Sequence, residues 1–272
     1  MLKKSIGVFD SGFGGIGILR GIVKKMPEYD YIYLGDTART PYGTRSQETI
    51  YEFTKQAVDF LFAQNCELII FACNTVSAGA LRRIQQEYLP KKYPGKNVLG
   101  VLKPASESAV EITKNNRIGV IATEATVRSR AFEIQLKIEK RGVKVFQKAT
   151  NLLVPIVEAL EKHPKATELI LTQYLKPLVN KKIDTLILGC THYSFLESEI
   201  RKVVGSKIKI VSEEKILPGK LQNYLKRHTE MDSKLTQGGT VTFYSTDLTD
   251  KFRILGSKFF GKKISVKKAS LN

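Results

Sequence analysis

The sequence is poor in sulfur and in long apolar runs. It has no tryptophan, three methionines and only three cysteines among 272 residues. Three cysteines cannot build a disulfide framework, which favours a reducing compartment. No apolar run approaches the roughly 18 residues that a membrane span requires, and Ile6 to Phe9 is too short for a secretory signal. We therefore expect a cytoplasmic protein that does not contact a membrane.

Acidic residues are also scarce. The chain has 26 Asp and Glu against 44 Lys and Arg, so its formal net charge is +18. Such a charge is compatible with nucleic-acid binding, and it also raises the local concentration of a small anionic substrate. We favour a solvated lysine-rich surface over nucleic-acid contact, because the basic doublets are scattered rather than gathered in one stripe. These doublets are Lys91-Lys92, Lys181-Lys182, Lys262-Lys263 and Lys267-Lys268.

Short apolar runs alternate with segments of helical period along the whole chain. The runs read as buried strands, and a helix is expected from about residue 50, with Thr49 as a possible cap. Alternating strands and helices predict an α/β fold with mostly parallel sheets. The predicted strands are Ile6–Phe9, Tyr31–Leu34, Leu68–Ala72, Ile118–Ala122 and Thr185–Leu188. Leu89–Lys96, with two prolines and a glycine, is the best linker candidate.

Two pairs of similar segments predict that the chain has two related halves. The segment that begins at Ile6 is similar to one that begins at Ile118, and each ends in a short polar run. Cys73 and Cys190 likewise each follow an apolar strand. Because the carboxyl ends of strands are where ligands bind in open α/β sheets, these ends are candidate site positions.

Each of the two cysteines at strand ends is followed by polar residues. Cys66 lacks such a group of polar residues, and we interpret it as structural. Asn74-Thr75 follows the first thiol and Thr191-His192 follows the second. Free cysteine is often simply a buried residue, but the matched pair favours function over that interpretation. No metal site is expected, because ligand spacing is absent. A Cys190–His192 nucleophile is conceivable but leaves Cys73 without a role.

A competing motif lies after the first strand. Gly12, Gly14 and Gly17 satisfy the dinucleotide fingerprint, and Asp36 ends the second strand where a ribose-binding carboxylate belongs. The alternative is therefore a nicotinamide-dependent dehydrogenase. We rank it second, because Asp10 would put a carboxylate at the mouth of a loop that must accept a pyrophosphate.

Taken together, four segments resemble the glutamate racemases of the aspartate/glutamate racemase superfamily. They are Phe9-Asp10-Ser11-Gly12-Phe13-Gly14-Gly15, residues 35–43, Ala72-Cys73-Asn74-Thr75-Val76-Ser77-Ala78 and Leu188-Gly189-Cys190-Thr191-His192-Tyr193. The resemblance implies a cofactor-independent enzyme that interconverts L- and D-glutamate and supplies D-glutamate for peptidoglycan. It also implies two pseudo-symmetric α/β domains with the active site in the cleft between them, and a homodimer. We place the first domain at 1–97 plus 212–272 and the second at 98–211. Aspartate racemase is the nearest alternative.

The resemblance also implies roles for individual residues. Cys73 and Cys190 would be the acid/base thiols, with Asp10 assisting the first and His192 and Glu158 assisting the second. Donors beside each sulfur, or a cation, are expected to lower the ordinary thiol pKa. The implied substrate-binding set is Asp10, Ser11, Tyr42, Gly43, Asn74, Thr75, Thr123, Thr126, Thr191 and His192. The chain departs from the family pattern at Ala149-Thr150, at Ser194 and at Val211-Ser212-Glu213-Glu214.

Overall fold

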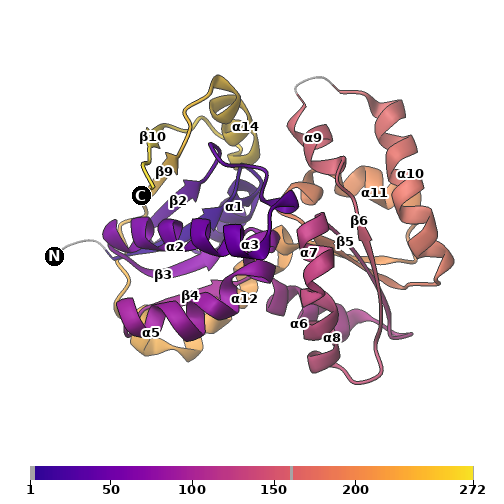
Figure 1. The fold of residues 1–272 in the computed structure, drawn as a ribbon, viewed down its shortest axis with the longest axis horizontal. Helices are drawn as coiled ribbons and strands as arrows, with labels where there is room; N and C mark the ends of the chain where they lie inside the picture. The colour runs from indigo at the N-terminus through magenta and orange to yellow at the C-terminus, as the bar shows by residue number, and fades with distance from the viewer. Residues whose placement is uncertain (1–3, 160–161, 272) are drawn as a thin grey trace.

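The computed structural model describes residues 4–159 and 162–271, which form two α/β halves, each built on one parallel sheet (Figure 1). The first sheet has the strand order β10-β9-β2-β1-β3-β4, with β1 (Ser5–Asp10), β2 (Tyr31–Gly35), β3 (Cys66–Phe71), β4 (Asn97–Gly100), β9 (Val241–Ser245) and β10 (Val266–Lys268). The second has the order β6-β5-β7-β8, with β5 (Arg117–Ala122), β6 (Lys144–Ala149), β7 (Thr185–Gly189) and β8 (Lys209–Val211). Every strand pair is parallel, so the predicted fold class is confirmed.

The segments that resemble each other in sequence occupy equivalent places in the two sheets. β1 and β5 each have two neighbours, and β3 and β7 lie on the same side of them, so the order β2-β1-β3-β4 repeats as β6-β5-β7-β8. All residues of β1, β3 and β7 are buried, as expected for parallel strands covered on both faces. The apolar pattern did not predict five of the strands: β4, β6, β8, β9 and β10. Among them, β6 is partly exposed and lacks a continuous apolar run.

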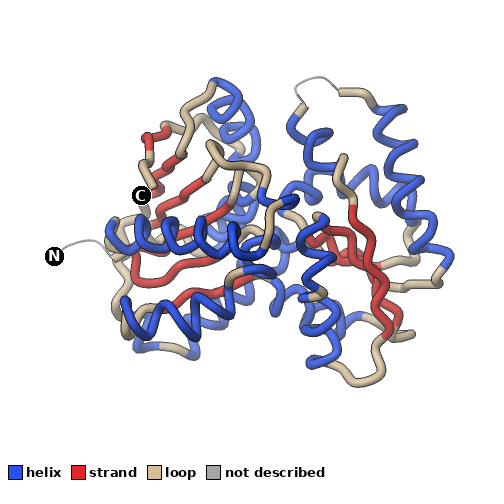
Figure 2. Tube along the Cα trace, in the orientation of Figure 1, coloured by secondary structure: helices blue, strands red, loops and turns tan. Residues whose placement is uncertain are grey.

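Helices cover both sheets, as the blue and red segments of Figure 2 show. In the first half they are α1 (Gly15–Lys25), η1 (Tyr42–Thr44), α2 (Gln47–Ala63), α3 (Asn74–Gly79), α4 (Leu81–Arg83), η2 (Ile84–Tyr88), α5 (Leu89–Lys92) and α14 (Asp250–Phe260). Over the second sheet and between the two halves lie α6 (Leu102–Ile112), α7 (Glu124–Ser129), α8 (Ala131–Glu139), α9 (Leu153–Glu158), α10 (Pro164–Asn180), η3 (Thr191–Leu196), α11 (Glu197–Val204) and α12 (Glu213–Arg227). Helix α13 (Thr229–Asp232) returns to the first half, where Asp232 accepts a hydrogen bond from Tyr29 at 2.5 Å. No described helix is both long and apolar enough to cross a membrane.

The cap of α2 differs from the prediction. Ser46, not Thr49, is the N-cap, and its side chain accepts a hydrogen bond from the backbone N–H of Thr49 at 3.2 Å. Thr49 therefore lies inside the first turn, and the helix begins earlier than the apolar pattern indicated.

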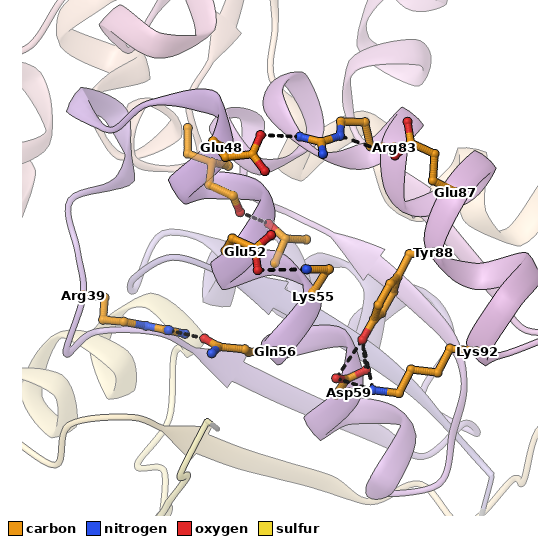
Figure 3. A network of polar contacts seen from close by, with 12 residues as sticks. Arg39, Glu48, Glu52, Lys55, Gln56, Asp59, Arg83, Glu87, Tyr88 and Lys92 are labelled. Carbon is orange, nitrogen blue, oxygen red and sulfur yellow. Dashed lines mark hydrogen bonds and ion pairs between the residues drawn. The ribbon is translucent and has the colours of Figure 1, made fainter.

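The predicted linker Leu89–Lys96 is wrong. The segment contains α5 and packs against α2, where Lys92 contacts the carboxylate of Asp59 beside Tyr88, the residue that precedes the segment (Figure 3). Lys96 donates to Glu67 at 2.8 Å, and β4 then joins the first sheet beside β3. Proline and glycine here punctuate a helix and a turn rather than separate two domains. Since β4 ends at Gly100, the first sheet extends three residues beyond the proposed boundary at residue 97.

The two halves share packed surface. The largest cluster of buried apolar side chains includes Ile6 and Val8 of β1 as well as Val120 and Ile187 of the second sheet. Helix α12 connects them, because it packs against α1 on one side and α6 on the other.

Candidate active site

The carboxyl ends of strands from both sheets border one cavity of about 390 Å³. Cys73 follows β3 and Cys190 directly follows β7, so equivalent strands bring the two thiols to the same space. The lining is Ser11, Thr40, Pro41, Tyr42, Gly43, Thr44, Cys73, Asn74, Thr75, Thr123, Asn151, Val154, Pro155, Glu158, Ala159, Cys190, Thr191, His192, Tyr193 and Lys251. Each half of the molecule thus contributes one thiol and several hydroxyl groups to this cavity.

Cys73 is the N-cap residue of α3 and is 6% exposed. Its sulfur lies 3.4 Å from Ser11 Oγ. Burial, with the nearby Asp10 carboxylate, raises the pKa of Cys73 to about 11. The expectation that neighbouring donors lower this pKa is therefore wrong, because removal from water outweighs the hydrogen bonds.

Cys190 has an imidazole beside it. Its Sγ lies 3.8 Å from Nδ1 of His192, and Nε2 of the same ring lies 3.1 Å from Glu158 Oε1. Burial raises the pKa of Cys190 well above the ordinary thiol value. Burial alone would also raise the pKa of Glu158, but hydrogen bonds from His192 and Lys251 bring it below the ordinary carboxyl value. The second thiol thus ends a chain of polar groups that leads to the other half.

Asp10 lies behind the cavity wall rather than in it. It is 1% exposed and does not line the cavity. Its carboxylate accepts from the backbone N–H of Gly12 at 2.8 Å and from Thr191 Oγ1 at 3.3 Å. Burial raises the pKa of Asp10, although the charge of His192 and these hydrogen bonds oppose the effect. Asp10 therefore connects the two halves through its hydrogen bond with Thr191.

Three threonine hydroxyls form a second connection between the halves. Thr75 Oγ1 lies 2.9 Å from Thr123 Oγ1, which lies 3.0 Å from Thr126 Oγ1. Thr126 is fully buried and absent from the lining, so it supports its neighbours from behind. A Cβ added to Gly43 would lie 2.9 Å from Cβ of Thr123, so glycine permits the close approach of the two halves here. The remaining predicted substrate-binding residues all line the cavity: Ser11, Tyr42, Gly43, Asn74, Thr75, Thr123, Thr191 and His192.

The glycine-rich loop has no room for a pyrophosphate in this arrangement. A Cβ on Gly14 would lie 2.2 Å from Thr191 Oγ1 and 2.7 Å from His192 Nδ1, because the second half covers the loop. Asp36 is fully buried and accepts hydrogen bonds from Arg39, Tyr42 and Thr246. Its carboxylate therefore orders the loop after β2 and is not available to a ribose. The geometry argues against the dehydrogenase alternative.

Sequence reasoning missed two charged residues at this site. Lys251, on α14, lines the cavity and donates to Glu158 Oε2 at 3.1 Å. Glu213, the first residue of α12, accepts from Asn74 Nδ2 at 2.7 Å. Both contacts join segments that are 93 and 139 residues apart in the sequence, and no local motif signals them. Within the described residues, no group of three or more His, Cys, Asp or Glu side chains is arranged to hold a metal ion.

Two α/β halves that each contribute a thiol to one cavity are the arrangement expected of a two-thiol racemase. The family model described as Asp/Glu/Hydantoin racemase matches residues 16–213. The chain belongs to this family. Its relatives include glutamate racemases: that of Chlorobaculum parvum is 39% identical over 266 residues, which cover 95% of this chain and 93% of the relative.

Solved structures agree with this assignment. A glutamate racemase isoform from Bacillus anthracis has a TM-score of 0.91 and 32% identity, covering 100% of this chain and 99% of that one. The Francisella tularensis glutamate racemase in complex with D-glutamate has a TM-score of 0.88 and 32% identity, with the same coverage. An aspartate racemase homologue from Pyrococcus horikoshii has a TM-score of 0.56 and 15% identity, covering 82% of this chain and 99% of that one, and shares the fold alone.

Proposed function

We propose that the protein is a glutamate racemase, an isomerase that interconverts L- and D-glutamate with Cys73 and Cys190 as its two acid/base groups. The observation that supports this most directly is the convergence of one thiol from each half on a single cavity. Burial raises the pKa of Cys190, and the negative charge of a Cys73 thiolate adds to this effect.

Racemisation requires a base on one face of the α-carbon and an acid on the other. One thiol would abstract the α-proton as a thiolate while its counterpart, still protonated, delivers a proton to the opposite face. Raised pKa values keep both thiols protonated near neutral pH. The ammonium group of the bound amino acid would favour the thiolate form by its positive charge, so that thiolate formation is coupled to substrate binding.

The polar groups beside each thiol suit different roles. Ser11 and Asp10 lie on the Cys73 side, whereas His192 and Glu158 form the chain on the Cys190 side. We assign His192 to proton transfer with Cys190, and Glu158 to holding its imidazole. Asp10 does not line the cavity, and its negative charge would help to keep the Cys73 thiol protonated. Its carboxylate would also hold Thr191 in place through their hydrogen bond.

The carbanion-like transition state needs stabilisation without an electron-accepting cofactor. Hydrogen bonds from Ser11, Thr75 and Thr123 to the substrate carboxylate would strengthen as charge develops in the enclosed cavity. Cofactor independence, supply of D-glutamate for peptidoglycan, a cytoplasmic location and the homodimer belong to this proposal.

Polarimetry of the purified protein with D-glutamate and then D-aspartate, without added cofactor, tests the function. We expect turnover of glutamate and little of aspartate; a requirement for a nicotinamide cofactor, or a preference for aspartate, would contradict the proposal.

Cysteine variants test the assignment of the thiols. Cys73→Ala and Cys190→Ala should each lower kcat by about a thousandfold or more, because each removes one of two obligatory proton-transfer groups. Cys66→Ala is the matched control: this thiol is fully buried outside the lining and should tolerate replacement. Full activity in either of the first two variants would defeat the two-thiol assignment.

A further inference from the structure

Beneath the cavity, the carboxyl group of Glu213 lies against the amide of Asn74. Glu213 is 3% exposed and Asn74 is 2% exposed. Asn74 Nδ2 donates to Glu213 Oε2 at 2.7 Å. A buried glutamate at the floor of a site is costly unless it has a specific contact to make, and this hydrogen bond is the one described for it.

The remaining atoms of this pair are without partners. Among the described residues, no hydrogen bond reaches Asn74 Oδ1 or Glu213 Oε1, and both atoms are buried. Asn74 also lines the cavity, next to Cys73. Since one N–H of the amide is engaged by Glu213, its orientation is fixed, and Oδ1 is left as an acceptor that still needs a donor.

The ammonium group of an amino acid supplies such a donor. We propose that Glu213 is a positioning residue of the racemase: it holds the Asn74 amide with Nδ2 turned to α12, so that Oδ1 accepts a hydrogen bond from the substrate ammonium. The inference rests on the proposed function. Glu213 itself does not line the cavity and acts only through Asn74.

The protonation state of Glu213 fits this role. Burial, assisted by the negative charge of Asp10, raises the pKa of Glu213 well above its ordinary value, although the hydrogen bond from Asn74 opposes the effect. A neutral carboxyl group still offers a carbonyl oxygen to Nδ2. Glutamine has the same shape and the same acceptor, so it is a conservative replacement, whereas methionine keeps the volume without the acceptor.

Steady-state kinetics in both directions test the proposal. Glu213→Met leaves the Asn74 amide free to turn, and we expect KM to rise about tenfold for both enantiomers with kcat changed less than about threefold, because binding is lost equally in the ground and transition states. Glu213→Gln should stay within about threefold of the parent protein. Glu214→Gln is the matched control, since the carboxylate of Glu214, next to Glu213 in the sequence, pairs with Arg20 and not with Asn74.

A double-mutant cycle separates positioning from general damage. On an Asn74→Ala background, Glu213→Met should change kcat/KM by less than about twofold, because the amide that it orients is gone. An equal loss on both backgrounds, equal losses in the Met and Gln variants, or no loss in the Met variant would overturn the proposal. Parent protein without glutamate turnover would instead refute the function itself, so the two failures are distinguishable. Circular dichroism melting of each variant establishes that the compared proteins are folded.

Discussion

The thiols of Cys73 and Cys190 are protonated groups in a closed site rather than exposed reactive cysteines. Burial is the main cause of the raised pKa of each thiol, and the pKa of Cys73 rises to about 11. Alkylation requires the thiolate. We therefore expect inactivation by iodoacetamide to be slow near neutral pH and to keep accelerating as pH rises through 9 and 10.

Saturating glutamate should slow this inactivation by covering the cavity. The rate of activity loss against pH checks the prediction, with Cys66→Ala as the background that removes the third thiol. A rate that levels off below pH 8 would contradict the raised pKa of the site thiols.

His192 should affect the two directions unequally. Its imidazole lies 3.8 Å from Cys190 and has no comparable contact with Cys73 among the described residues. His192→Asn should therefore lower kcat in one direction several-fold more than in the other. The two kcat/KM values stay equal, because the equilibrium constant of a racemisation is one, so the ratio of the two KM values must change by the same factor as the ratio of the two kcat values. Equal changes in both kcat values would assign His192 to binding or folding instead.

Much of the site could be predicted at the residue level because it follows short motifs at strand ends. Ser11, Asn74, Thr75 and Thr191 all lie where their motifs placed them. Glu213 and Lys251 could not be predicted, since each reaches the site through a contact distant in sequence. Thr126, by contrast, belongs to the implied substrate-binding set but lies behind the cavity wall. The direction of the thiol pKa shift depends on burial, which a sequence does not report.

At the scale of elements, continuous apolar runs predicted the central strands, whereas the edges were missed. β6 is partly exposed and β8 has only three residues, so neither carries a strong pattern. The start of α2 shows a related limit: Thr49 and Ser46 both suit a helix cap, and which one caps depends on the backbone, which becomes extended at Ser46 (φ −69°, ψ 156°).

The cap of α2 predicts a stability effect without a catalytic one. Ser46→Ala should lower the free energy of unfolding by about 1 kcal/mol, since it leaves the N–H of Thr49 without its acceptor. Racemisation should be unchanged, because Ser46 does not line the cavity. Urea unfolding of this variant beside Thr49→Ala measures the effect, and a larger loss in the threonine variant would show that the cap is misassigned.

At the scale of the whole molecule, the two halves both line a cavity that is proposed to take an anionic substrate. Lys251 of α14 pairs with Glu158 of α9 across the cavity, and Figure 1 shows these two helices on opposite halves. The pair is partly exposed, with side-chain exposures of 44% and 15%, so its contribution to stability is expected to be below about 1 kcal/mol. Its larger effect should be on the electrostatic field at the cavity.

Lys251→Met should therefore raise KM for glutamate a few-fold and weaken the rise of KM with salt, because a cation at the cavity attracts the anionic substrate. Lys262→Met removes the same charge away from the lining and serves as the control. Equal KM values in the two variants would show that Lys251 has no local influence and that only the net charge of +18 matters.

The central claim, that two thiols serve opposite faces, is tested most directly by the origin of the transferred hydrogen. The reaction is started in heavy water with unlabelled D-glutamate and stopped early, and both enantiomers are analysed for deuterium at the α-carbon. If Cys73 abstracts and a solvent-exchanged Cys190 donates, the L-glutamate formed carries deuterium almost quantitatively while the remaining D-glutamate is nearly free of it. Substantial unlabelled L-glutamate at early times would mean that one group serves both faces, and would contradict the two-thiol mechanism even if both cysteines proved essential.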